Sequence, residues 1–406
     1  MESAVTYTAL GGSNTCGHGL RAANRDAFQT LVSSGLAEAG TRPVTLQPSC
    51  IPAMGPDYPA SCIEYFAPNT TAFATLEFTP NMGEGRELMR NTVHLEQMAR
   101  GLMRRGSRVV IVSLVPRPPD CSKCIREFEA AHARVQLVAR RARLPLISMF
   151  YNTSTWSADL KHLNAAGHQQ VAAAVLKAFA SPASRGGRDS DAGGPSERGT
   201  GADSSTDGHD DNTDGNEHGG AHSGGLPTCV FGQDLVPLML PGSRGFGLTW
   251  QVGRHRDKPG LLATEPGSVL RLCLRGLPPS FGVSLALERS DVLPMGNVTL
   301  GCESPCSCPL ELLSNGDWTL RYSGHGTRRA TESYMHRVFG ARRGVAHDLQ
   351  GGGSDSCDCV LMVRHEQHAG NSHARIKLNG LVAGGSGRIG WANRFHMGLN
   401  PHVLSG

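Results

Sequence analysis

Predicted strands and helices alternate over the first 180 residues, and this alternation most constrains the fold. The clearest strand, 108–115, is almost wholly apolar and is ended by the prolines that follow it. The clearest helix, 85–105, has apolar residues at every third or fourth position. Such alternation predicts an α/β fold, a parallel sheet with flanking helices. The predicted strands are 4–10, 43–47, 72–77, 108–115 and 144–150, and the predicted helices are 22–33, 85–105, 124–142 and 164–180.

Polar residues with catalytic chemistry follow several of these strands. Ser13 follows the first strand, Asn81 the third, and Asp159 with His162 the last. The carboxyl ends of parallel strands meet at one edge of a sheet, so these side chains are expected to lie together. An Asp three residues before a His can hold one ring nitrogen and leave the other as a general base. We therefore predict a Ser13–His162–Asp159 nucleophilic triad.

The first 180 residues resemble the SGNH (GDSL-like) hydrolases, a superfamily of serine esterases, lipases, carbohydrate deacylases and acyltransferases. The matching stretches are Gly12-Ser13-Asn14-Thr15, Ala53-Met54-Gly55, Glu77-Phe78-Thr79-Pro80-Asn81, and Asp159 with His162. Stretches 229–235 and 258–268 resemble a plant and green-algal branch in which a β-rich domain follows the hydrolase. The resemblance implies an SGNH-like, flavodoxin-like parallel sheet.

The resemblance also implies an oxyanion hole. Its donors would be the backbone N–H of Ser13, expected at the start of a helix, a backbone N–H in the Ala53–Gly55 loop, and the Asn81 amide. Two positions depart from the pattern. The loop donor in the family is usually Gly, whereas the best register places Ala53 there and Gly55 two residues on, and the asparagine is followed by Met82 instead of Asp. The mechanism needs no metal and no organic cofactor.

Each candidate also has a purely structural interpretation. Ser13 could cap a helix, Asn81 could stabilise a loop, and His168 is expected to pack or cap. Cys16 is expected to be a disulfide partner or a small core residue and not a nucleophile. Cys121-Ser122-Lys123-Cys124 has the spacing of a redox motif, but its context favours a local disulfide or plain thiols.

Three domains or segments are predicted. Residues 1–180 form the hydrolase-like domain, and 181–225, composed largely of Gly, Ser, Asp and His, form a disordered linker. Residues 226–406 form a β-sandwich-like accessory domain with a disordered C-terminal tail, because short alternating runs are separated by Gly and Pro turns. Its expected strands include 268–274, 282–288, 360–364 and 375–381, while 327–336 is ambiguous.

Twelve cysteines and three N-x-[ST] sequons, at Asn69, Asn152 and Asn297, favour a secreted, disulfide-bonded glycoprotein. No signal peptide precedes Ser3, so either a targeting segment is missing from the sequence or the protein is cytosolic with reduced thiols. A Cys-only zinc site in the second domain is conceivable, but the spacings favour disulfides. The net charge of +4 is scattered, which argues against nucleic acid, and no apolar run is long enough to span a membrane.

The sequence thus predicts a serine esterase that hydrolyses acyl esters, with O-acetylated glycans as the first substrate class to try. Transfer of the acyl group to a sugar hydroxyl is a second interpretation. A non-catalytic carbohydrate- or protein-binding module on an SGNH scaffold is a third. The expected partner is an acylated small molecule or glycan, and the oligomeric state is left open.

Overall fold

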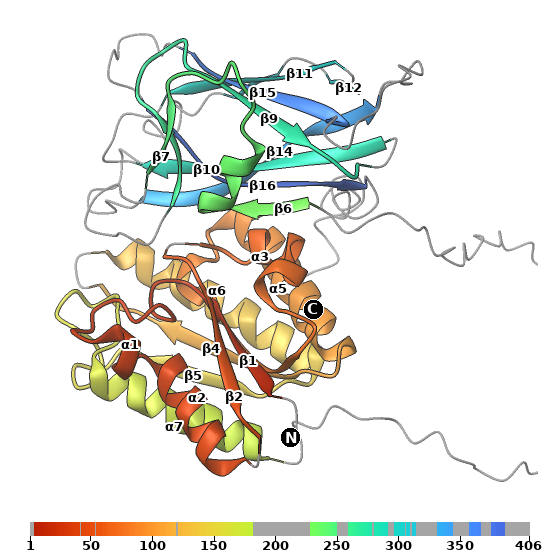
Figure 1. Cartoon of the computed structure of the whole chain (residues 1–406). Coiled ribbons are helices and arrows are strands. Elements are labelled where there is room, and N and C mark those ends of the chain that lie inside the picture. Colours follow the sequence, from red (N-terminus) through yellow and green to blue (C-terminus); the bar gives the residue numbers. More distant parts are fainter. Residues whose placement is uncertain are drawn as a thin grey trace, which may run out of the picture.

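The chain folds into an α/β part followed by a β-rich part (Figure 1). The structure is a computed structural model. It describes residues 4–40, 42–52, 54–118, 121–181, 228–249, 259–277, 280–290, 296–304, 306–308, 311–313, 331–343, 357–366 and 375–385. The predicted linker after Ser181 and the predicted C-terminal tail lie outside the described residues, as does Ala53.

The α/β part contains a five-stranded parallel sheet in the order β2-β1-β3-β4-β5. This is the flavodoxin-like strand order, so the predicted fold class is confirmed. Its strands are β1 (Val5–Gly11), β2 (Val44–Cys50), β3 (Thr71–Glu77), β4 (Arg108–Val115) and β5 (Leu146–Phe150). Its helices are α1 (Ala23–Asp26), α2 (Phe28–Ala39), α3 (Asp57–Ser61), α4 (Ile63–Phe66), η1 (Thr79–Asn81), α5 (Gly85–Arg104), α6 (Ser122–Ala142) and α7 (Ala165–Ala180).

Successive residues of β4 enter two different cores, which shows how the sheet is covered. Ile111 packs in the core that contains residues of α5 and α6, whereas Val110 and Val112 pack in the core that contains residues of α2 and α7. Because side chains alternate across a strand, a strand buried on both faces is apolar almost throughout. This double burial is why β4 was the clearest strand in the sequence.

Two details of the α/β part differ from the prediction. The helix expected at 22–33 is divided into α1 and α2, because Ala27 adopts extended backbone dihedrals (φ −67°, ψ 141°). The short helices α3 and α4 were not predicted at all. They lie in the connection from β2 to β3, and each helix is too short to show a helical period in the sequence.

The β-rich part is built from two antiparallel sheets that enclose one apolar core. The seven-stranded sheet has the order β12-β14-β10-β16-β8-β7 with β6 paired to β16, and the four-stranded sheet has the order β13-β11-β15-β9. The sandwich prediction is confirmed, and the ambiguous segment includes the start of a strand, β14. The elements are β6 (Thr228–Phe231), η3 (Gly232–Leu238), β7 (Phe246–Thr249), β8 (Gly260–Ala263), β9 (Val269–Leu274), β10 (Ser280–Ser290), β11 (Asn297–Glu303), β12 (Cys306–Ser307), β13 (Glu311–Leu313), β14 (Thr331–Arg343), β15 (Cys359–Glu366) and β16 (Ile376–Gly385).

All twelve cysteines are paired in disulfides, as the sequence analysis favoured. The sulfurs of Cys302, Cys306 and Cys359 lie within 4.8 Å of one another, which is close enough for a metal cluster. Each of them is in a disulfide, however, and a disulfide sulfur is not a thiolate ligand. The pairs are Cys16–Cys50, Cys62–Cys229, Cys121–Cys124, Cys273–Cys357, Cys302–Cys308 and Cys306–Cys359.

None of the helices in the described part of the chain is both long enough and apolar enough to cross a membrane.

Candidate active site

Ser13 lies in a series of tight turns directly after β1. The backbone N–H of Cys16 donates to Gly12 O (3.2 Å), and that of His18 donates to Ser13 O (2.9 Å). Ser13 was expected to begin a helix, and this expectation is wrong. Gly17 (φ 77°) and Gly19 (φ 89°) have left-handed backbone dihedrals that interrupt helical geometry, so Ser13 lies in turns and does not stand at the first turn of a helix.

Asp159 and His162 lie in the loop between β5 and α7. The loop is closed by a bridge between Trp156 and Leu163, and the Ser157 N–H donates to His162 O (2.8 Å). Leu160 adopts φ 56°, an unusual value for a non-glycine residue, which bends the chain sharply between Asp159 and His162. The bend brings the two side chains together.

The structure joins Ser13, His162 and Asp159 in one chain of hydrogen bonds. His162 Nδ1 lies 2.5 Å from Asp159 Oδ2, and His162 Nε2 lies 2.9 Å from Ser13 Oγ. The other carboxylate oxygen, Asp159 Oδ1, accepts hydrogen bonds from the Ser157 hydroxyl (2.5 Å) and from the backbone N–H groups of Lys161 (2.9 Å) and His162 (3.0 Å). Residues that lie 149 positions apart in the sequence are thus placed in contact.

The hydrogen bonds on Asp159 set its charge. Partial burial alone would raise the pKa of the carboxyl, but the hydrogen bonds from His162, Ser157 and the Lys161 backbone outweigh burial and hold that pKa well below its usual range. An ionised carboxylate only accepts hydrogen bonds, so the proton between the two groups belongs to His162 Nδ1. In a neutral imidazole that carries its proton on Nδ1, His162 Nε2 is the acceptor for the Ser13 hydroxyl. This arrangement can remove the proton from a serine that attacks an acyl carbon.

Asn14 contributes to this geometry, although the sequence analysis gave it no role. Its Oδ1 accepts a hydrogen bond from the Leu163 N–H (2.9 Å), and its Nδ2 donates to Lys161 O (3.3 Å). Both contacts bracket His162, so Asn14 ties the turn that carries Ser13 to the loop that carries the base. The only sequence signal for this contact is its position beside Ser13.

The amide of Asn81 lies against the residue that precedes Ser13. A Cβ built on Gly12 would lie only 2.1 Å from Asn81 Nδ2, so a larger residue at position 12 would displace the amide. Gly55 packs on the same loop, since a Cβ there would lie 3.1 Å from Asn81 O. Met82 is buried, and its carbonyl accepts from the Asn91 amide (3.0 Å). A buried methionine and Asn91 therefore support the Asn81 loop at the position where the family pattern has an aspartate.

Two further histidines lie near the site. The ring centre of His18 lies 5.7 Å from that of His162. His168 is fully buried, its Nδ1 accepts from the Phe28 N–H (3.1 Å), and burial lowers its pKa to about 4. His168 is thus a neutral packing residue that holds the start of α2, in agreement with the expectation that it packs or caps.

Glu77, at the end of β3, lies beneath the Ser13 turn. The Thr15 hydroxyl donates to its Oε2 (3.0 Å), and its side chain is 1% exposed. Burial raises the pKa of Glu77 to about 8, although hydrogen bonds from Thr15 and Gly12 act in the opposite direction. The carboxyl is therefore protonated in the folded protein at neutral pH, whereas it is ionised in the unfolded chain.

This difference predicts a pH-dependent stability. Between about pH 4.5 and 8 the folded protein binds one proton more at Glu77, so its free energy of unfolding falls as pH rises, by up to about 1.4 kcal/mol per pH unit. Glu77→Gln is expected to remove this slope. Urea unfolding of the wild type and of Glu77→Gln between pH 6 and 8.5 measures the pH slope of the free energy of unfolding in each protein. His168 contributes a slope of the opposite sign to both proteins, and this contribution cancels when the two slopes are subtracted. Equal slopes in the two proteins would contradict a raised pKa at Glu77.

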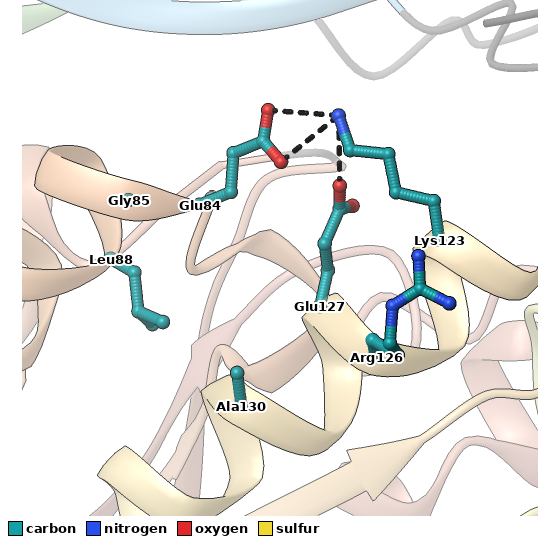
Figure 2. Close-up of a pocket in the computed structure, with 8 residues that line it drawn as sticks. Glu84, Gly85, Leu88, Lys123, Arg126, Glu127 and Ala130 are labelled. Carbon is teal, nitrogen blue, oxygen red and sulfur yellow. Dashed lines mark hydrogen bonds and ion pairs between the residues drawn. The ribbon is translucent and has the colours of Figure 1, made fainter.

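A cavity of about 320 Å³ lies between the starts of α5 and α6 (Figure 2). Leu88 and Ala130 contribute apolar surface to it, while Lys123 forms ion pairs with Glu84 (3.2 Å) and Glu127 (3.4 Å). None of the residues that line it belongs to the Ser13–His162–Asp159 chain of hydrogen bonds. Its Lys123–Glu84 pair connects the loop that follows Asn81 to α6, close to the Cys121–Cys124 disulfide.

Of three comparisons with known proteins, only the comparison with solved structures finds matches that cover both parts of the chain. No family model matches the sequence, and a search of curated proteins finds no significant match. Among solved structures, the chain is similar to a two-domain esterase (CEX) active on acetylated mannans. The TM-score is 0.55 at 14% identity, over 94% of this chain and 91% of that chain. The structure of that esterase co-crystallized with mannopentaose gives a TM-score of 0.55 at 15% identity over the same shares. The chain therefore has the two-domain fold of this esterase, with a flavodoxin-like parallel sheet in its first domain.

Proposed function

We propose that this protein is a serine esterase that hydrolyses O-acetyl esters of glycans. The observation that carries the proposal is the continuous hydrogen-bonded chain from Ser13 Oγ through His162 to Asp159, at the carboxyl edge of the parallel sheet. The glycan substrate class rests on the similarity to an esterase active on acetylated mannans. No organic cofactor enters the proposed reaction.

In the proposed first half-reaction, Ser13 Oγ attacks the acetyl carbonyl carbon while His162 Nε2 takes the hydroxyl proton. The tetrahedral intermediate collapses, the bond to the sugar oxygen breaks, and His162 returns the proton to that oxygen. In the second half-reaction, His162 removes a proton from water, which attacks the acetyl-enzyme, and acetate leaves as Ser13 regains its proton. Asp159 stays ionised and stabilises the imidazolium formed in each half.

The proposed oxyanion donors are the backbone N–H of Ser13, the Asn81 amide and a backbone N–H of the loop at Gly55. Support comes from the packing of Asn81 against Gly12 and of Gly55 against Asn81. Ala53, the other loop candidate, stays a prediction, since it lies outside the described residues. Donors already in place cost no reorganisation as negative charge develops on the carbonyl oxygen.

The direct test of the function is acetate release from chemically acetylated mannan and xylan, with p-nitrophenyl acetate as a generic ester. The control is the same protein inactivated with a fluorophosphonate, which blocks an activated serine and leaves the rest of the protein unchanged. We expect turnover of the generic ester and of at least one acetylated glycan by the untreated protein alone. Turnover of neither ester by the folded protein would contradict the proposed function.

Asn81→Ala is expected to lower kcat for p-nitrophenyl acetate about 10²- to 10³-fold with little change in KM, because the amide acts on the oxyanion and not on the bound ester. Steady-state kinetics measures the effect. Asn81→Asp is the matched variant, since it keeps the side-chain size and removes the donor. A kcat near the wild-type value in both variants would contradict the proposed role of Asn81 as an oxyanion donor.

A further inference from the structure

The segment from Met54 to Cys62 connects the proposed oxyanion loop to the C-terminal domain. It contains Gly55 and then α3, whose residues Asp57, Tyr58 and Pro59 are all buried. Figure 1 shows β6 of the C-terminal domain lying over α3. This segment therefore runs from the proposed oxyanion loop into a helix that lies against the second domain.

The chain is fixed on the side of the first domain just before this segment. The Cys16–Cys50 disulfide joins the Ser13 turn to the end of β2, and the Ile51 N–H donates to Gly11 O (3.0 Å). Beyond that point, the Met54 N–H donates to Ile51 O (3.1 Å), which is a turn within the loop itself. The loop has no strand or long helix of its own to hold a donor in place.

On the other side, Tyr58 anchors the segment in the C-terminal domain. Its hydroxyl donates to Val230 O in β6 (2.8 Å), and its ring centre lies 5.6 Å from that of Phe231. Tyr58 is only 2% exposed. A Cβ at Gly380 would lie 2.6 Å from Tyr58 Oη, so the close approach of β16 depends on glycine at that position.

A covalent bond and a shared core strengthen the anchor. Cys62, the residue after α3, forms a disulfide with Cys229 of β6. Met54 and Tyr58 belong to one apolar core with Ala286 of β10 and Val382 of β16. Side chains in a packed core have few alternative positions, so a shift of the second domain would be transmitted to Met54 and Gly55.

We propose that Tyr58, together with the Cys62–Cys229 disulfide, is a positioning element through which the C-terminal domain holds the oxyanion loop. This inference rests on the proposed esterase function. A backbone donor acts on the transition state only if it is held at hydrogen-bond distance from the developing oxyanion. Loosening the anchor should therefore weaken transition-state stabilisation and leave ester binding nearly unchanged.

The test compares two variants of the full-length protein, Tyr58→Phe and the double variant Cys62→Ala with Cys229→Ala. Two readouts are measured, the kinetics of p-nitrophenyl acetate hydrolysis and the Kd of phenylboronic acid, which forms a tetrahedral adduct with an active serine. We expect kcat to fall about fivefold in Tyr58→Phe and about tenfold or more in the double variant, while KM changes less than about twofold. The boronic acid should bind more weakly by a similar factor.

Two matched controls separate positioning from general destabilisation. Tyr65→Phe also removes a tyrosine hydrogen bond to the C-terminal domain, to Asp234 Oδ2 (2.7 Å), but from a residue that is 42% exposed and lies in α4. Cys273→Ala with Cys357→Ala removes a disulfide inside the C-terminal domain. Both controls should keep kcat within about twofold of the wild type. Tyr65→Phe keeps the backbone hydrogen bond from the Tyr65 N–H to Cys62 O (2.9 Å) and removes only the hydroxyl that bonds to Asp234. The Cys273–Cys357 disulfide joins two residues of the C-terminal domain.

Unchanged kcat in Tyr58→Phe would overturn the inference, as would equal losses in the controls or an unaltered affinity for the boronic acid. If the disulfide-free variant fails to fold, Tyr58→Phe decides the question alone. A wild-type protein without turnover or fluorophosphonate labelling would overturn the proposed function together with this inference. If the wild type turns over ester and both anchor variants keep its kcat, only the positioning role is contradicted and the proposed function stands.

Discussion

Ser13→Ala is expected to abolish ester hydrolysis, with kcat for p-nitrophenyl acetate lowered at least about 10⁴-fold. The reason is that no other hydroxyl in the described residues is hydrogen-bonded to His162 Nε2. Residual catalysis would come only from the oxyanion donors and from binding. Steady-state kinetics with enzyme at high concentration measures the remaining rate.

The fold should be unaffected by this substitution. The Ser13 backbone carbonyl accepts its hydrogen bond from the His18 N–H, and alanine keeps that contact. Circular dichroism and the thermal midpoint provide the check. Ser154→Ala is a suitable control, since it removes an exposed hydroxyl that bonds to Asn152 in the same domain. If Ser13→Ala retains more than about a tenth of wild-type turnover, Ser13 is not the nucleophile.

Asp159→Asn is expected to lower kcat about 10³- to 10⁴-fold. The asparagine keeps one oxygen to accept from the Lys161 and His162 backbone, so the loop geometry is retained. Its amide, however, would donate to His162 Nδ1 and drive the ring proton to Nε2. The imidazole could then no longer accept the proton of Ser13, although the ring would stand in the same place.

A matched variant isolates this tautomer effect. Ser157→Ala removes a hydrogen bond to the same carboxylate and leaves the Asp159–His162 contact intact, so its kcat should fall less than about tenfold. The measurement is kcat and kcat/KM of both variants on p-nitrophenyl acetate. Equal losses in Ser157→Ala and Asp159→Asn would mean that the carboxylate acts through loop structure and not through the imidazole.

The α/β fold could be predicted because its central strands, β1, β3 and β4, are mostly buried. β4 coincides with its predicted range, and α5 and α7 each differ by one residue from their own predicted ranges. Long buried elements give a clear apolar period, which makes their bounds predictable. The edge strand β2 was less visible, because few of its residues are buried. The helix at 22–33 was predicted as one element because the backbone change at Ala27 leaves no mark on apolar spacing.

The residues of the candidate site could be predicted where the chemistry depends on the side chain itself, as it does for Ser13, Asp159 and His162. Asp159 and His162 stand at a fixed spacing in one loop, and the order of the strands brings Ser13 to them. The contribution of Asn14 could not be derived, because its contacts with Lys161 and Leu163 depend on how two loops fold together. The raised pKa of Glu77 likewise arises from burial, which a glutamate at a strand end does not reveal.

The contacts between the two domains could not be predicted from the sequence. The sequence analysis could favour disulfides from the number of cysteines, but the pairing of Cys62 with Cys229 spans 167 residues and has no local pattern. Tyr58 lies in α3, a five-residue helix that the sequence analysis did not predict. The disordered linker that was expected between the two parts lies outside the described residues and stays a prediction. The sequence analysis predicted neither the disulfide nor the shared core that join the two parts.

Fluorophosphonate labelling of the folded wild-type protein, with the modified peptide identified by mass spectrometry, tests the central claim most directly. It reports whether a serine in this protein is activated, whatever the natural substrate is. The account predicts about one label per molecule, located on Ser13, with esterase activity lost in proportion to labelling. A folded protein that neither labels nor turns over ester, or that labels on another residue, would contradict it.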